Sequence, residues 1–110
     1  MGNTTMTPAL IEIVAARFKA LGEPVRLQIL NALRGGELTV TELVDRTGLG
    51  QPNLSKHLRL LHTLGFVSRR KDGLFVYYGL ADADVFRLCD IMCTRLQAES
   101  ATRRRVLAVR

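Results

Sequence analysis

The hydrophobic positions of this chain fall into short segments with helical spacing, and glycine or proline separates one segment from the next. From about residue 8 to residue 21, apolar side chains recur every three or four positions, which predicts a helix that begins at Pro8. Pro24 opens a second segment of the same kind, and the Gly35-Gly36 pair ends it. The first third of the chain is therefore predicted to form two helices.

A third helix is predicted to be short. Thr39 and Glu42 fit the Thr-x-x-Glu capping box, which places the start of this helix at Thr39 or Thr41. Gly48 follows only a few residues later and tolerates the positive φ that ends many helices. A fourth helix is then predicted over about residues 51–64, after a brief turn.

The pattern changes after the fourth helix. The stretch FVSRRKDGLFVYYGL, residues 66–80, contains two β-prone runs separated by Asp72-Gly73, which is a strong signal for a β-hairpin. A last helix is predicted to start after Asp82 or Asp84, either of which can cap it, and to run to about Ala101.

Length and composition fit one domain built mainly from helices. A chain of 110 residues has room for one hydrophobic core, so residues 1–110 are expected to form a single domain. Aromatic residues make up only 5% of the chain, and a core of Leu, Ile, Val and Ala favours packed helices over an aromatic-rich β-sandwich. The predicted fold class is mainly α with a small β-hairpin, in the order helix, helix, helix, helix, strand, strand, helix.

The chain carries no signal for a membrane or for secretion. No apolar run approaches the length of about 20 residues that a membrane helix needs. The first residues, MGNTTMTPAL, lack the basic region and apolar stretch of a secretory signal. Cys89 and Cys93 lie too close together to close a structural loop, which favours a reducing compartment. We expect a cytoplasmic protein.

The predicted fourth helix has two different faces. At 100° per residue, Leu54, Leu58 and Leu61 share one face. The opposite face carries two cations and two hydroxyl groups but no carboxylate, and its residues are Pro52, Ser55, Lys56, Arg59 and Thr63.

Negative charge is missing from a long segment around this helix. No Asp or Glu occurs between Asp45 and Asp72, whereas six cations do: Arg46, Lys56, Arg59, Arg69, Arg70 and Lys71. The whole chain has 16 Lys and Arg against 10 Asp and Glu, for a net charge of +6. A cationic surface without acids suits a phosphate backbone, although most charged helix faces are simply solvated.

Two features favour nucleic-acid binding. A short helix, a glycine-containing turn and a second helix with a polar outward face form a helix-turn-helix, whose second helix enters the major groove. A hairpin with a basic tip follows at once, and the two together predict a winged helix. An enzyme is disfavoured because the chain has no phosphate-binding glycine loop or catalytic constellation. A protein-interaction module would instead carry acids or apolar groups on the outward face.

Four segments resemble the arsenic-repressor (ArsR) family of winged-helix transcriptional repressors in order and spacing: FKALGEPVRLQILNAL, GELTVTEL, TGLGQPNLSKHLRLLHTLGFV and RRKDGLFVYYGL. They cover roughly residues 18–80. The resemblance implies a homodimer whose first and last helices, about 8–21 and 83–101, pair across a two-fold axis. It also implies double-stranded DNA as partner, in the form of a palindromic operator, and an inducer that lowers DNA affinity.

The last helix supports a dimer independently of this resemblance. Val85, Cys89, Met92 and Leu96 form an apolar stripe, and the residues that widen it on both sides are Phe86, Leu88 and Cys93. This arc is broader than the core of one small monomer needs. Isologous pairing through it would place two recognition helices about one DNA turn apart.

The resemblance also assigns residues that contact DNA. In the fourth helix, those that would meet the major groove are Gln51, Asn53, Ser55, Lys56 and His57. Ser55 and Lys56 are the strongest candidates because both lie on the outward face, and Gln51 follows them. For Asn53 and His57, at the flank of that face, solvent exposure or helix packing is an equal alternative.

The remaining contacts are expected to be electrostatic. Arg59 is interpreted as a phosphate contact, and Arg70 and Lys71 as the contacts of the wing. One position departs from the family, which often has Ser or Thr where this chain has Gly50. Glycine supplies no side-chain acceptor for the first amides of the recognition helix, so Gln51 or a phosphate is expected to take that role.

Two metal sites of the family are predicted to be absent. The arsenic, lead and cadmium site uses a Cys-Val-Cys element, and this chain has Thr39-Val40-Thr41, whose hydroxyls do not replace thiolates for soft ions. The zinc or nickel site needs histidine in the last helix. Asp82 and Asp84 are present there, but no histidine follows His62.

Cys89 and Cys93 remain as a candidate inducer site. At positions i and i+4 they are neighbours on a helix and could hold one soft ion such as As(III). Trivalent arsenic normally takes three thiolates, so a third ligand would come from the partner subunit, a small thiol or water. A disulfide or polysulfide is a second interpretation, and packing like Ala or Val is a third. DNA binding itself is expected to need no cofactor.

Overall fold

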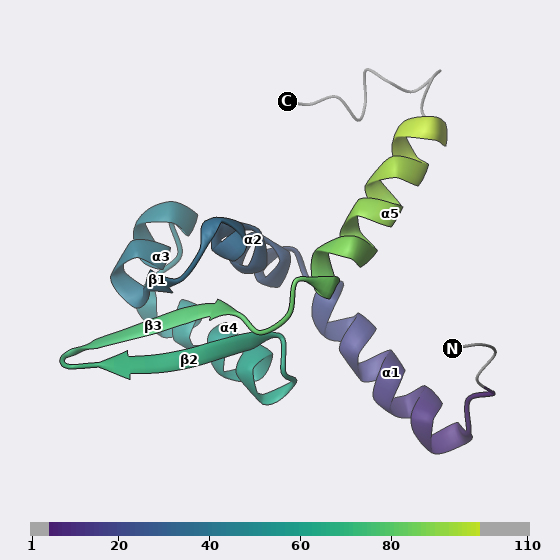
Figure 1. The fold of residues 1–110 in the computed structure, drawn as a ribbon, viewed down its shortest axis with the longest axis horizontal. Coiled ribbons are helices and arrows are strands. Elements are labelled where there is room, and N and C mark those ends of the chain that lie inside the picture. The colour runs from purple at the N-terminus through teal and green to yellow at the C-terminus, as the bar shows by residue number, and fades with distance from the viewer. Residues whose placement is uncertain (1–4, 100–110) are drawn as a thin grey trace.

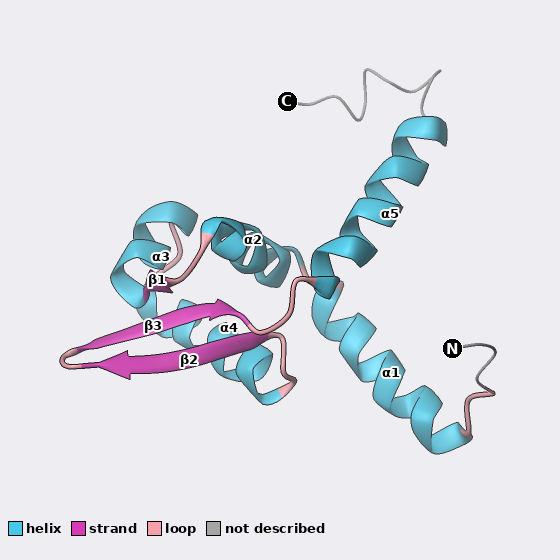
Figure 2. Ribbon diagram, viewed as in Figure 1, coloured by secondary structure: helices cyan, strands magenta, loops and turns pink. Residues whose placement is uncertain are grey.

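The computed structural model describes residues 5–99, and its elements occur in the predicted order (Figures 1 and 2). The helices and strands are α1 (Pro8–Leu21), α2 (Pro24–Ala32), the 3-10 turn η1 (Leu33–Gly35), β1 (Leu38–Thr39), α3 (Val40–Thr47), α4 (Gln51–Thr63), β2 (Val67–Asp72), β3 (Phe75–Leu80) and α5 (Asp84–Glu99). The mainly helical winged helix-turn-helix fold is confirmed. The predicted end of the last helix near Ala101 falls outside the described residues.

Local capping explains where several helices begin. The Thr7 side chain accepts a hydrogen bond from the Leu10 amide at 3.2 Å, which caps α1. The predicted capping box of α3 is complete, because Thr39 Oγ1 accepts from the Glu42 amide at 3.2 Å while Glu42 Oε1 accepts from the Thr39 amide at 2.8 Å. Of the two starts left open by the sequence, Thr39 is the N-cap.

The sheet contains one strand more than the sequence predicts. Its order is β1-β3-β2 and both pairs are antiparallel. β1 is only two residues long and pairs with Tyr77 and Tyr78, too short a contact to leave a periodic signal in the sequence. In the hairpin, Asp72 pairs with Phe75, so the turn residues are 73 and 74, one position later than the predicted Asp-Gly turn.

The hydrophobic core lies between α2, α3, α4 and the sheet. Its buried members are Ile29, Leu30, Leu33, Leu38, Leu43, Leu54, Leu58, Leu61, Val67 and Val85. The predicted inward face of α4 is confirmed, because each of its three leucines is 0% exposed. By contrast, α1 and α5 each have a single buried residue, Ala20 and Val85.

The two terminal helices project from this core on the side away from the hairpin (Figure 1). The start of α5 is held to the core by Arg34, whose Nη2 lies 3.1 Å from Asp90 Oδ1 and whose guanidinium carbon lies 4.1 Å from the centre of the Phe86 ring. Within the described residues, no helix combines the length and hydropathy needed to cross a membrane.

Candidate nucleic-acid interface

The helix-turn-helix is formed by α3, residues 48–50 and α4. Gly48 has φ 74°, a left-handed conformation that glycine adopts without strain, and its amide donates to the Val44 carbonyl at 2.8 Å. The chain can therefore leave α3 and start α4 only a few residues later. Leu43 on α3 is fully buried together with the α4 leucines, which fixes the two helices against each other.

The residues of α4 that the sequence predicts to contact DNA differ in their exposure to solvent. Gln51, Asn53, Lys56 and Arg59 are exposed, whereas Ser55 and His57 are half-buried. Lys56 and Arg59 have no ion pair among the described residues, so their charges face solvent. Gly50 is the N-cap of α4 and forms no side-chain cap, as its lack of a side chain requires. The first turn of α4 therefore has no side-chain cap, and the exposed cations Lys56 and Arg59 follow it along the helix.

His57 forms a hydrogen bond with Arg26, a residue of α2 that also contacts the end of α1. Arg26 Nε donates to His57 Nδ1 at 3.3 Å, and Arg26 Nη1 donates to the Ala20 carbonyl at 3.3 Å. A ring nitrogen that accepts a hydrogen bond carries no proton, so the ring proton of His57 lies on Nε2. The helix-packing alternative predicted for His57 is thus present, and its Nε2–H remains as a donor.

Five of the six cations in the acid-free segment have no ion pair in the described part of the chain: Arg46, Lys56, Arg59, Arg69 and Lys71. All five are exposed. Exposed cations without counter-charges on adjoining elements produce a positive potential that a polyanion can neutralise. This cationic surface covers α3, α4 and β2.

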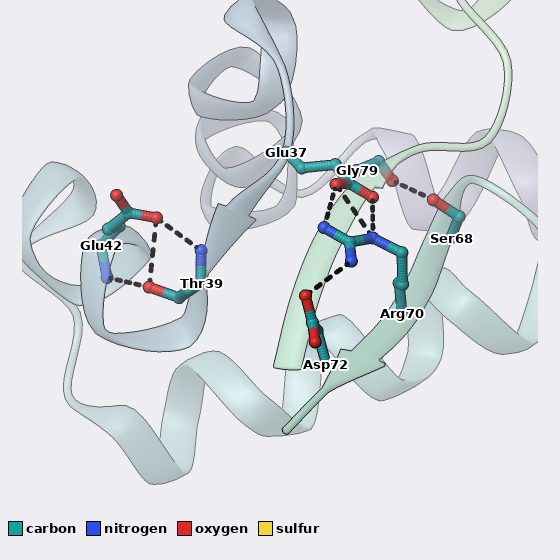
Figure 3. Close-up of polar contacts among 7 residues, drawn as sticks. All are labelled: Glu37, Thr39, Glu42, Ser68, Arg70, Asp72 and Gly79. Carbon is teal, nitrogen blue, oxygen red and sulfur yellow. Dashed lines mark hydrogen bonds and ion pairs between the residues drawn. The ribbon is translucent and has the colours of Figure 1, made fainter. Parts of the chain in front are cut away.

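Arg70 is the exception, and its partner was missed by sequence reasoning. Its guanidinium forms a bidentate pair with Glu37, with Nη2 to Oε1 at 2.8 Å and Nε to Oε2 at 3.2 Å (Figure 3). The hydrogen bonds from Arg70 lower the pKa of Glu37, and those to Glu37 raise the pKa of Arg70. The two residues are 33 positions apart, and no local pattern marks such a pair.

The two cysteines lie on α5, away from the cationic surface. Cys89 is half-buried and Cys93 is exposed, and both are free thiols. Among the described residues, no cluster of three or more His, Cys, Asp or Glu side chains is placed to hold a metal ion. A three-coordinate soft ion at this pair would therefore need a ligand from outside the described part of one chain.

Known proteins share both this sequence pattern and this fold. The family model described as "Bacterial regulatory protein, arsR family" matches residues 23–69. The chain is 34% identical over 105 residues to a probable mercury resistance operon repressor of Streptomyces lividans, and the match covers 84% of each protein.

Two solved structures extend the similarity to three dimensions. The crystal structure of Mycobacterium tuberculosis Rv0081 has a TM-score of 0.78 at 32% identity, over 89% of this chain and 98% of the other. The solution structure of a homodimeric winged helix-turn-helix DNA-binding domain, Mb0332 from Mycobacterium bovis, has a TM-score of 0.71 at 34% identity and covers 90% of both chains. This chain therefore belongs to the arsR family of bacterial regulatory proteins, which are winged-helix DNA-binding transcriptional repressors and not enzymes.

Proposed function

We propose that this protein is a homodimeric repressor that binds a palindromic operator and releases it when an inducer engages Cys89 and Cys93. The observation that supports DNA binding best is the set of exposed cations on α3, α4 and β2 that have no ion pair within residues 5–99. Because these cations lie on a helix-turn-helix, they can approach phosphates while α4 lies in the major groove.

Each contact is assigned by the chemistry of its side chain. Lys56 and Ser55, together with Gln51, are proposed to meet base edges, because the N-terminal part of a recognition helix reads the major groove. Arg59, one turn further along α4, is assigned to a phosphate. Lys71 is assigned to the phosphates beside the groove, because the hairpin extends past the helices.

Dimerisation is proposed to use the apolar faces of α1 and α5. Large apolar side chains are exposed on both helices: Ile11, Ile13, Phe18, Leu88, Ile91, Met92 and Leu96. A groove of about 470 Å³ lies between α1, the α4–β2 turn and the start of α5, and its lining is mostly apolar. A single chain leaves these surfaces in contact with water, which a second copy would exclude. The homodimeric relative from M. bovis supports a dimer, without indicating which surfaces form it.

The inducer is proposed to be a soft metal(loid) ion such as arsenite. Cys93 is exposed and Cys89 half-buried on the same helix, so an ion can reach the pair from solvent. The relative named for a mercury resistance operon supports a soft-ion inducer. Oxidation of the two thiols or reaction with polysulfide is the alternative chemistry at the same pair, and a purely structural role is the remaining one.

The test of DNA binding begins with selection of a palindromic duplex from a random pool. Affinity is then measured as a function of salt for the wild type and for Lys56→Gln/Arg59→Gln. Arg59→Gln removes one phosphate contact from each subunit, so the slope of log K against log salt should fall by about 2 per dimer, and Lys56→Gln should also reduce the discrimination between operator sequences.

A matched control removes the same charge elsewhere. Lys19→Gln/Arg95→Gln takes one exposed cation from α1 and one from α5, and it should leave the salt slope close to that of the wild type. Equal slopes for the two double variants would show that net charge alone, and not the α4 surface, holds the DNA.

A further inference from the structure

Arg70 is the one cation of the acid-free segment whose side chain is already occupied within the described structure. Besides its bidentate pair with Glu37, its Nη1 lies 3.5 Å from Asp72 Oδ2 (Figure 3). Its guanidinium carbon lies 4.4 Å from the centre of the Tyr77 ring. All three guanidinium nitrogens and one guanidinium face therefore have partners. A phosphate would have to share this side chain with two carboxylates that already offset its charge, Glu37 and Asp72.

The strand geometry places Arg70 on the opposite face of the hairpin from its neighbours. Side chains alternate along β2, and Val67 points into the core that contains the α4 leucines. Arg69 and Lys71 follow Val67 at even spacing and share its face, on the side of the recognition helix. Arg70 lies on the other face with Asp72, opposite Tyr77 in the register.

Gly79 provides the space through which Glu37 reaches Arg70. β3 separates β1 from β2, so the Glu37 side chain must cross β3, and it does so at Gly79 (Figure 3). A Cβ atom at Gly79 would lie 3.0 Å from Glu37 Cγ, closer than carbon atoms normally approach. Gly79 does not have a positive φ, so its lack of a side chain serves this close approach and not an unusual backbone conformation.

Glu37 is itself fixed relative to the helix-turn-helix. It lies two residues before Thr39, whose capping box with Glu42 fixes the start of α3. Figure 3 shows the capping box and the Arg70 pair on either side of this short connection. Since Arg70 lies in the middle of β2, the Glu37–Arg70 pair joins the hairpin to the start of the helix-turn-helix. This pair is termed the wing clamp.

We propose that Arg70 is a positioning residue, and that the wing clamp holds the hairpin at the angle at which Lys71 and Arg69 meet DNA phosphates. Arg70 then makes no phosphate contact of its own. This role replaces the direct DNA contact that the family resemblance assigns to it. The proposal rests on DNA binding by the cationic surface. The lowered pKa of Glu37 is consistent with it, because an ionised Glu37 keeps the guanidinium occupied and its charge neutralised.

The first experiment compares Glu37→Gln with Asp45→Asn in operator binding. Both variants remove one carboxylate, but Asp45 is exposed on α3 and its side chain makes no hydrogen bond or ion pair within the described residues. If Arg70 were a phosphate contact, Glu37→Gln would release its guanidinium and tighten binding at least as much as Asp45→Asn. The wing clamp predicts that Glu37→Gln instead weakens binding by about three- to tenfold, the effect of a misplaced phosphate contact. Tightening by Glu37→Gln would overturn the proposal.

Gly79→Ala tests the same geometry without changing any charge. The added methyl group displaces the Glu37 side chain, so binding should weaken to a similar extent at unchanged net charge. Far-UV circular dichroism and urea unfolding identify any variant that fails to fold. If Gly79→Ala does not fold, the charge reversal Glu37→Arg/Arg70→Glu is used in its place. This double variant should bind the operator more tightly than Arg70→Glu alone. No recovery would contradict the wing clamp.

A double-mutant cycle separates positioning from direct contact. Arg70→Ala should weaken binding in the wild-type background but weaken it less in the Lys71→Ala background, because one of the two contacts that Arg70 positions is already gone. If Arg70 and Lys71 were two independent phosphate contacts, their losses of affinity would add, and the salt slope would fall by about 4 per dimer in the double variant. If Arg70 only positions other contacts, the fall in salt slope should not exceed that caused by losing those contacts. Additivity would therefore assign Arg70 to the phosphate.

One readout does not involve DNA and so distinguishes failure of this inference from failure of the proposed function. In the free protein, ¹⁵N relaxation of residues 70–75 should show larger fast motions in Glu37→Gln than in Asp45→Asn. An unchanged hairpin in Glu37→Gln would overturn the wing clamp whether or not an operator has been found. Failure of the wild type to select any duplex would instead overturn the proposed function alone.

Discussion

At the scale of single residues, Cys89 and Cys93 differ in how far they are open to solvent. Cys89 is half-buried on the apolar side of α5 and Cys93 is exposed, although they are only one helical turn apart. A thiol that packs in a protein interior is inert, whereas an exposed thiol can bind a soft ion or be oxidised. In the proposed function, Cys93 would therefore be the point of entry for the inducer, and Cys89 would be the residue through which the packing of α5 changes.

We expect Cys89→Ser/Cys93→Ser to uncouple DNA binding from the inducer. Operator binding by the wild type should fall about tenfold or more with at least one of arsenite, another soft ion or polysulfide, within the usual range of allosteric coupling. The double variant should bind DNA normally and show no such fall. Fluorescence anisotropy of a labelled operator, titrated with each compound, measures both quantities.

Met92→Leu provides the control for this substitution, because it removes a neighbouring sulfur atom from α5 without removing a thiol. It should respond like the wild type. If the double cysteine variant also responds like the wild type, the two cysteines have only a packing role.

At the scale of the elements, Arg26 joins three helices. It lies in the first turn of α2, donates to a carbonyl at the end of α1, and donates to His57 in the recognition helix. Lysine cannot make these two contacts together, because it lacks the planar fork of a guanidinium. The orientation of α4 therefore depends on a residue outside the helix-turn-helix.

We expect Arg26→Lys to lower the free energy of unfolding by about 1.5–3 kcal/mol, the usual contribution of hydrogen bonds that involve a charged group. Urea denaturation measures this change. Hydrogen exchange of the α4 amides near His57 should also become faster, because the side chain that holds His57 is lost. Arg46→Lys, at an exposed arginine of α3 with no ion pair in the described structure, should change neither quantity. Equal stability of the two variants would show that the hydrogen bonds of Arg26 do not stabilise α4.

The elements also show which features a local pattern can predict. The three α4 leucines are predicted correctly because a helical wheel depends only on residues close in sequence. The hairpin is predicted correctly, but its turn is displaced by one residue. Pairing Val67 with Leu80 keeps Val67 in the core, and a slip of one residue would turn it outward, so burial overrides the Asp-Gly preference.

At the scale of the whole molecule, α1 and α5 extend away from the core with little of their surface buried. Ile91 is 65% exposed near the middle of α5 and was not part of the apolar stripe predicted from the sequence. Two such helices from each chain offer a much wider apolar surface than either helix alone. The proposed dimer would bury it and bring two α4 helices onto one duplex.

We expect Ile91→Glu to weaken or abolish the dimer, because a carboxylate cannot be buried in an apolar interface without a partner. Sedimentation equilibrium should show a shift toward monomer. Operator affinity should fall by about 100-fold or more, since each monomer then binds its half-site without the other. Leu27→Glu changes an exposed leucine of α2, 38% exposed, and should remain dimeric. A dimeric Ile91→Glu variant would place the interface elsewhere.

The sequence alone determined the features that depend on neighbouring residues. These are the order of the elements, the capping box of α3, the inward leucines of α4 and the absence of acids around them. The tertiary structure decided which polar groups meet across the chain. Arg70 and Glu37 are 33 positions apart, and Arg26 and His57 are 31 apart. Such pairs form only because the sheet and the helix packing bring their backbones together, so no periodicity in the sequence can report them.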